Sequence, residues 1–124
     1  MPQIRGFGDQ TTINLFLPSN NPAERFAIAK IIARLQRRYG GLTHSRIAQP
    51  VFSGYWHTMR NGRRVWVRDE ITWVLVDTTE DVEDTKFQQY LVRLKKAIHD
   101  EYQKVQWPQD EIWIIVREGS RVVG

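Results

Sequence analysis

The sequence predicts a single α+β domain with a ferredoxin-like sandwich, in which an antiparallel sheet carries two helices on one face. Three observations support this. Segments with the two-residue period of strands and the 3.6-residue period of helices follow in the order βαββαβ. An Asn61-Gly62 pair joins the two middle strands as a hairpin. The 124 residues suffice for one core but not for two. We therefore expect residues 1–124 to form one domain whose second sheet face is open.

The first strand and first helix have clear boundaries. Residues 1–10 are expected to be a flexible N-terminus, and residues 11–17 alternate between apolar and polar side chains as a half-buried strand does. Asn21 at the N-cap and Pro22 at the first position predict a helix that ends near Tyr39, before two glycines. Its apolar stripe is expected to be Phe26, Ala29, Ile32, Ala33 and Leu35.

The stretch from Ser53 to Asp77 predicts two long strands around the Asn61-Gly62 turn, whereas residues 42–49 give an ambiguous signal. A two-residue loop sets the register, with these opposing pairs: Arg60 and Arg63, Thr58 and Val65, His57 and Trp66, Trp56 and Val67, Tyr55 and Arg68. We expect the following side chains to lie under the helices: Trp56, Val65, Val67, Ile71, Trp73 and Leu75. We expect the opposite side to be the open binding face: Tyr55, His57, Arg64, Trp66, Arg68 and Glu70.

The remaining elements are a second helix and a final strand. Residues 80–84 are expected to be a solvated acidic loop, and apolar residues at spacings of three and four predict a helix over 85–103. Residues 112–116 are apolar on both sides, which predicts a strand at the centre of the sheet or under a partner.

Composition excludes several classes of protein. The chain has no cysteine, which rules out disulfides and thiolate chemistry and fits a reducing cytoplasm. No apolar run approaches the roughly 20 residues of a membrane span, and residues 1–10 lack the apolar centre of a signal peptide. We expect a cytoplasmic protein without membrane contact.

Charge is unevenly distributed along the chain. Residues 1–68 hold 11 Lys and Arg against two acids, and residues 69–124 hold seven against 12. The hairpin arginines could meet phosphate or an acidic partner, or could serve only solubility and edge protection: Arg60, Arg63, Arg64 and Arg68.

No catalytic, cofactor or metal signature is present. The three histidines are dispersed, the serines lack a nucleophile-elbow context, and the glycine pairs do not form a phosphate loop. His57 and Glu70 could act as an acid/base pair, but an exposed histidine stacked on Trp66 is the favoured interpretation. We expect no catalytic residue, no cofactor and no metal, so enzyme activity is the less favoured hypothesis.

A set of short motifs resembles a small bacterial α/β family of unknown function. The motifs are Arg38-Tyr39-Gly40-Gly41-Leu42-Thr43, Gly54-Tyr55-Trp56, Gly62, Arg68-Asp69-Glu70 and Trp73-Val74-Leu75-Val76. The pattern is Gly-Leu-Thr after a helix, then Gly-x-Trp, a further Gly, and an Arg/Glu pair before an apolar strand. The resemblance spans most of residues 12–118 and departs from the pattern in the longer gap between Thr43 and Gly54. It nominates Thr43, Trp56 and Glu70 as positions of interest.

Two classes of function remain. The first is a binding or assembly module, a homodimer above all, that uses an open sheet face with Phe16, Tyr55, Trp66, Arg68 and Trp113 or Ile115. In a variant of this hypothesis the same face binds single-stranded nucleic acid. The second class is a small-molecule enzyme or carrier, with a pocket between sheet and helices lined by Trp56, Trp73, Tyr90 and His57.

Overall fold

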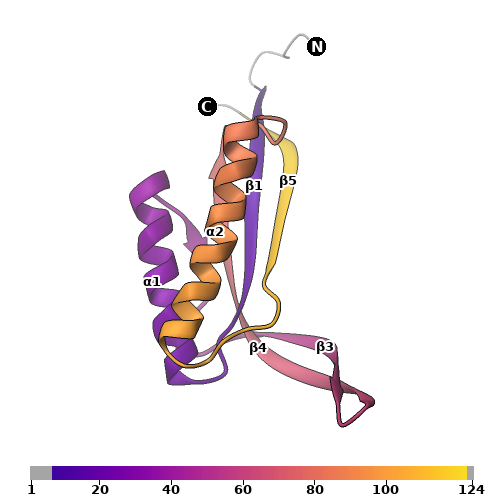
Figure 1. Cartoon of the computed structure of the whole chain (residues 1–124). Coiled ribbons are helices and arrows are strands. Elements are labelled where there is room, and N and C mark those ends of the chain that lie inside the picture. Colours follow the sequence, from indigo (N-terminus) through magenta and orange to yellow (C-terminus); the bar gives the residue numbers. More distant parts are fainter. Residues whose placement is uncertain (1–6, 123–124) are drawn as a thin grey trace.

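A computed structural model describes residues 7–122 of the chain, and the side chains of residues 8–121. The protein is an α+β domain with an antiparallel sheet and two helices, as expected (Figure 1). Its elements are β1 (Phe7–Pro18), α1 (Pro22–Tyr39), β2 (Thr43–His44), β3 (Phe52–Arg60), β4 (Arg63–Thr78), α2 (Thr85–Lys104) and β5 (Trp113–Val122). The expected four-strand βαββαβ order is not matched, because residues 43–60 form two separate strands, β2 and β3.

The body of the sheet has the strand order β2-β4-β1-β5. β1 pairs with both β4 and β5, so β1 lies inside the sheet and β5 lies at its edge. The final strand is therefore not central, and the alternative, that it lies under a partner, stays a prediction. Residues 7–10 belong to β1 and are not a flexible terminus, while residues 1–6 lie outside the described residues.

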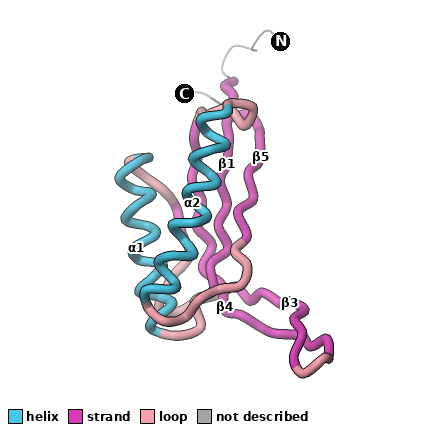
Figure 2. Tube along the Cα trace, viewed as in Figure 1, coloured by secondary structure: helices cyan, strands magenta, loops and turns pink. Residues whose placement is uncertain are grey.

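β4 is 16 residues long and serves two parts of the molecule. Its second half, from Ile71, pairs with β1, whereas its first half pairs only with β3. The hairpin of β3 and β4 therefore projects beyond the ends of both helices (Figures 1 and 2). We call residues 52–68 the arm. Asn61 and Gly62 have φ values of 51° and 76°, as a type I′ turn requires, and all five predicted cross-strand pairs are confirmed.

The core lies between the helices and one side of the sheet. Leu15 and Ile13 of β1 are fully buried there, and they lie directly opposite Val74 and Val76 of β4, which are also fully buried. Directly opposed residues share a sheet face, so the even-numbered residues of this half of β4 face the helices. The predicted inward face was therefore wrong: Trp73 is 37% exposed on the side away from the helices.

Local signals explain both helices. The side chain of Asn21 accepts a hydrogen bond of 2.9 Å from the backbone N–H of Glu24, and Gly40 ends α1 at φ 75°. The predicted stripe of α1 is only partly correct: Ile32 and Leu35 are buried, but Phe26, Ala29 and Ala33 are exposed. The side chains of α1 in the apolar core are Ala27, Ile28, Ile31, Ile32 and Leu35. The buried residues of α2 recur at the predicted spacings of three and four: Phe87, Tyr90, Leu94, Ile98 and Tyr102.

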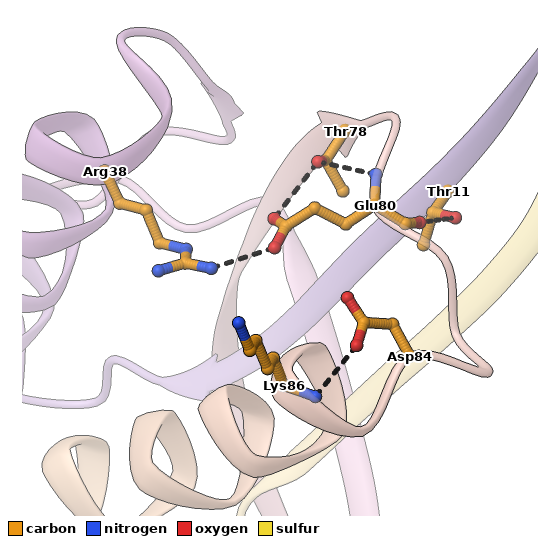
Figure 3. A network of polar contacts seen from close by, with 6 residues as sticks. All are labelled: Thr11, Arg38, Thr78, Glu80, Asp84 and Lys86. Carbon is orange, nitrogen blue, oxygen red and sulfur yellow. Dashed lines mark hydrogen bonds and ion pairs between the residues drawn. The ribbon is translucent and has the colours of Figure 1, made fainter.

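The loop between β4 and α2 is less solvated than expected, because Glu80 connects three elements (Figure 3). Its carboxylate pairs with Arg38 of α1 at 2.8 Å and accepts a hydrogen bond of 3.2 Å from Thr78. Its backbone carbonyl accepts a hydrogen bond of 2.6 Å from the hydroxyl of Thr11. The guanidinium of Arg38 also lies 3.6 Å from the ring centroid of Tyr90. Glu80 thus fixes the C-terminal end of α1 to the end of the sheet.

Tyr102 fixes the opposite end of the core. Its side chain is fully buried, and its hydroxyl donates a hydrogen bond of 2.8 Å to the carbonyl oxygen of Pro18. Burial raises the pKa of this phenol above its usual value, so the hydroxyl keeps its proton and remains a donor. In the described part of the chain, neither helix combines the length and apolarity needed to cross a membrane.

Candidate functional site

The arm has two faces of different chemistry. Alternation along β3 and β4 separates them, and the cross-strand pairs fix their membership. We call one the arm face: Tyr55, His57, Met59, Arg64, Trp66 and Arg68. The other face of the arm continues into the side of the sheet that the helices do not cover, and five aromatic side chains lie together on that side. We call these five the open face: Phe16, Phe52, Trp56, Trp73 and Trp113.

The arm face is highly exposed. Trp66 and Tyr55 are 68% and 60% exposed. The rings of His57 and Trp66 lie with centroids 3.7 Å apart, and Arg68 donates a hydrogen bond of 3.0 Å to the hydroxyl of Ser53. Five of the six residues predicted for the binding face therefore lie together, on two adjacent strands.

The location of this set differs from the prediction in one respect. By alternation the arm face is continuous with the helix-facing side of the sheet, and it is accessible because the arm extends past the helices (Figure 1). Glu70, the sixth predicted residue, is half-buried at the base of the arm, where its backbone N–H donates to the side-chain oxygen of Asn20 at 2.7 Å.

The open face is formed by side chains from four strands. Trp73 stacks on Phe16 with centroids 6.1 Å apart and meets the edge of Phe52 at 5.9 Å. Trp56 and Trp113 stack at 5.8 Å with an interplanar angle of 22°. Phe16 and Trp113 were predicted for the open side of the sheet, whereas Trp56 and Trp73 were predicted to face the helices and Phe52 was assigned to neither side. Only the pairing of β1 with β4 places Trp73 beside Phe16.

Two local features hold these indoles in place. Trp73 donates from its ring nitrogen to Asn14 at 3.0 Å, and Asn14 donates in turn to the carbonyl oxygen of Ile115 at 3.2 Å. Gly54 leaves room for the second indole, since a Cβ at that position would lie only 2.8 Å from the Trp56 ring. The side chains of the open face are thus positioned by specific contacts.

A groove of about 500 Å³ lies on the same side of the sheet, between the arm and the segment that precedes β5. Phe16, Trp56 and Trp113 line it together with three carboxylates: Asp69, Asp110 and Glu111. Hydrogen bonds support both of its walls. Asp69 accepts one of 2.9 Å from Asn20, and Gln109 donates one of 2.6 Å to Glu24.

The pocket predicted between sheet and helices is not formed by the expected residues. Trp56 and His57 line the groove just described, whereas Tyr90 is buried in the core. Trp73 lines a separate depression of about 350 Å³ with Asn14 and Arg117. The four aromatic residues therefore do not converge on one cavity.

The residues considered for chemistry are also separated. His57 and Glu70 are opposite Trp66 and Ser53, so they are two cross-strand rows apart on one face. That spacing is roughly 13 Å along the strands, far beyond the reach of a direct proton transfer. Within the described residues, no three His, Cys, Asp or Glu side chains are grouped so that they could hold a metal ion.

Comparison of the chain with models of known protein families and with curated proteins gave no match in either case. The family resemblance stated above thus stays a prediction. Thr43, Trp56 and Glu70, which it nominates, lie in β2, on the open face and at the base of the arm. The two faces themselves are therefore what points to a function.

Proposed function

We propose that this protein is a binding and assembly module in which two copies associate through the open face. The observation that carries the proposal is the cluster of aromatic side chains that neither helix covers. Within this cluster Trp73, Phe52 and Trp113 are 37%, 42% and 44% exposed. Aromatic residues in a buried, closely packed centre supply much of the energy of protein interfaces.

The size of the cluster fits an interface centre. A fully buried aromatic side chain removes about 200 Å² from water, so the three exposed fractions correspond to roughly 250 Å² of uncovered aromatic surface. The largest apolar patch on a typical monomer measures about 300–600 Å² and is often functional, so this cluster approaches that size. A stable interface needs about 800 Å² on each partner, which the surrounding polar residues of the sheet would complete.

Charges beside the cluster favour a second copy as the partner. Asp77 of β4 and Arg117 of β5 are both exposed, and both are opposite Thr12 of β1. They therefore lie on the open side of the sheet, one on each side of β1. A two-fold axis parallel to β1 would bring Arg117 of one copy over Asp77 of the other. Such self-complementarity is what an isologous dimer requires.

The strand arrangement supports a finer interpretation of the fold. β2 and β3 both pair with β4: β2 pairs with residues 74–75 of β4, and β3 pairs with residues 63–71 of β4. We interpret them as one interrupted strand, which would make the sheet a ferredoxin-like sheet with an extended hairpin. The lack of cysteine favours a reducing compartment, and we propose the cytoplasm.

Light scattering at several concentrations tests the assembly. We expect a dimer for the native chain and a folded monomer for Trp113→Glu, because a carboxylate at the interface centre would be buried without a partner. Val92→Glu is the control, since Val92 is 72% exposed on α2, away from the sheet. A native chain that stays monomeric, or a control that dissociates equally, would refute the proposal.

A second candidate function is small-molecule binding in the groove. Its volume of about 500 Å³ lies in the range of ligand pockets, and aromatic rings beside carboxylates would suit a cationic ligand. If the chain is a monomer at every concentration and binds such a ligand, Trp56→Ala should abolish that binding.

A further inference from the structure

We propose that the arm is a single-stranded nucleic-acid-binding element, in which bases stack on the arm face and the arginines contact phosphates. This inference does not depend on assembly through the open face, because the stacking rings, Arg64 and Arg68 lie on the opposite side of the arm. Arg60 and Arg63, beside the turn, lie on the same side of the arm as Trp56. It would hold for a monomer and for a dimer alike.

The distribution of charge is the first support. Residues 52–68 contain four arginines and no acidic residue. They therefore account for the whole formal net charge of +4, because the other residues hold 14 Lys and Arg against 14 Asp and Glu. A projecting segment with this charge attracts polyanions.

The geometry of the arginines is the second support. Arg60 and Arg63 are directly opposite each other beside the turn, an arrangement that is unfavourable without a counter-charge. Within the described residues, the ion pairs involve Arg34, Arg38 and Lys104 and none of the arm arginines. Arg64 and Arg68 lie on the arm face itself. A bound phosphate backbone would supply the missing negative charge.

The exposed rings are the third support, and they favour unpaired bases over a protein partner. Tyr55, His57 and Trp66 occupy two successive cross-strand rows, each with an aromatic or imidazole ring, and the rows are about 7 Å apart. Bases stack on such rings without sequence preference, but only where they are not paired in a duplex. Three acidic groups near the arm, Asp69, Asp110 and Glu111, line the groove, which His57 and Met59 of the arm face also line. Glu70 lies on the same face as Arg68, one row nearer the sheet, and is half-buried.

Binding is measured by fluorescence anisotropy of a labelled oligothymidylate of about 12 nucleotides, within the usual site size of such proteins. Trp66→Ala should weaken binding by about 5- to 150-fold, the range observed when a stacking side chain is removed. Trp107→Ala is the matched control, because Trp107 is 52% exposed in the loop after α2 and lies off the arm. Binding should be unchanged in this control.

Salt dependence tests the phosphate contacts. Four contacts predict a slope of log K against log salt of about −2.8, and the double variant Arg63→Gln/Arg64→Gln should reduce it to about −1.4. Lys95→Gln/Lys96→Gln, on the exposed surface of α2, removes the same charge elsewhere and should leave the slope unchanged.

Several outcomes would overturn the proposal. The first is binding to a duplex as tight as binding to the single strand, and the second is no loss of affinity in Trp66→Ala. Equal competition by polyglutamate would assign the arm to an acidic protein partner instead. If the native chain is a dimer and Arg63→Gln/Arg64→Gln is a monomer, the arm contributes to the dimer interface instead. Trp113→Glu should retain single-strand binding, so failure of one proposal is distinguishable from failure of the other.

Discussion

Replacement of Gly54 by alanine tests how the open face is positioned. The new Cβ would lie 2.8 Å from Cζ2 of Trp56 and 3.2 Å from Cγ1 of Ile71, so the indole must move. Overpacking of this kind costs about 1–3 kcal/mol. Loss of the stack between Trp56 and Trp113 would add about 0.5–1.5 kcal/mol. Against these costs, alanine restricts the unfolded chain and stabilises by about 0.4–1 kcal/mol. We expect a net loss of about 0.5–4 kcal/mol in the free energy of unfolding.

Urea unfolding of a double-mutant cycle isolates the cause. In a Trp56→Leu background, Gly54→Ala should cost little, because the indole that it displaces is absent. Gly119→Ala in β5 is the control, since a Cβ there meets nothing within 4 Å, and it should be neutral or slightly stabilising. The near-UV circular dichroism of the stacked indoles should change in Gly54→Ala and stay unchanged in Gly119→Ala. An equal loss in both backgrounds would show that contact with Trp56 is not the reason.

Two further predictions concern α1 and the core. Phe26→Ala should change the free energy of unfolding by less than about 1 kcal/mol, because Phe26 is largely exposed, whereas Ile28→Ala should cost about 2–5 kcal/mol because Ile28 is fully buried. Urea unfolding of both variants checks the orientation of the helix, and similar losses would contradict it. Tyr102→Phe should cost about 1–3 kcal/mol at neutral pH, because the carbonyl of Pro18 loses its donor. Burial raises the pKa of Tyr102, so above pH ~10 only the unfolded state releases this proton and stability falls with rising pH. The variant should lose less stability than the native chain in this range, by up to about 1.4 kcal/mol per pH unit, and parallel pH profiles would contradict the assignment.

Local chemistry made part of the fold predictable. The register of the arm follows from one turn, because Asn61 and Gly62 both tolerate positive φ and so fix every pair that follows. The start of α1 follows in the same way from the side chain of Asn21, which satisfies a free backbone N–H at the first turn.

The choice of inward face was not predictable by the same means. Trp73 and Leu75 are as apolar as Val74 and Val76, so alternation along β4 alone does not decide which pair the helices cover. The decision comes from β1, whose residues Ile13 and Leu15 are opposite the two valines. The same ambiguity affected α1, where apolar residues occur on several sides of the helix, and the core contains the three isoleucines but not Phe26.

The candidate site depended on both kinds of information. The arm face was predictable because its members are neighbours across a hairpin of known register. The open face was only partly predictable, since Phe16, Trp56, Trp73 and Trp113 come together through strand order and not through sequence proximity.

The length of β4 has a mechanical consequence. One strand of 16 residues, without glycine or proline, runs from the tip of the arm into the sheet between β1 and β2. It contains no glycine or proline hinge, and at about 3.4 Å per residue its backbone is roughly 50 Å long, with a bend where the arm leaves the sheet (Figure 1). The arm is thus a projection whose base is held inside the sheet by the same strand. A pull or twist at residues 61–62 would be transmitted along the backbone to Val74 and Val76, in the centre of the core.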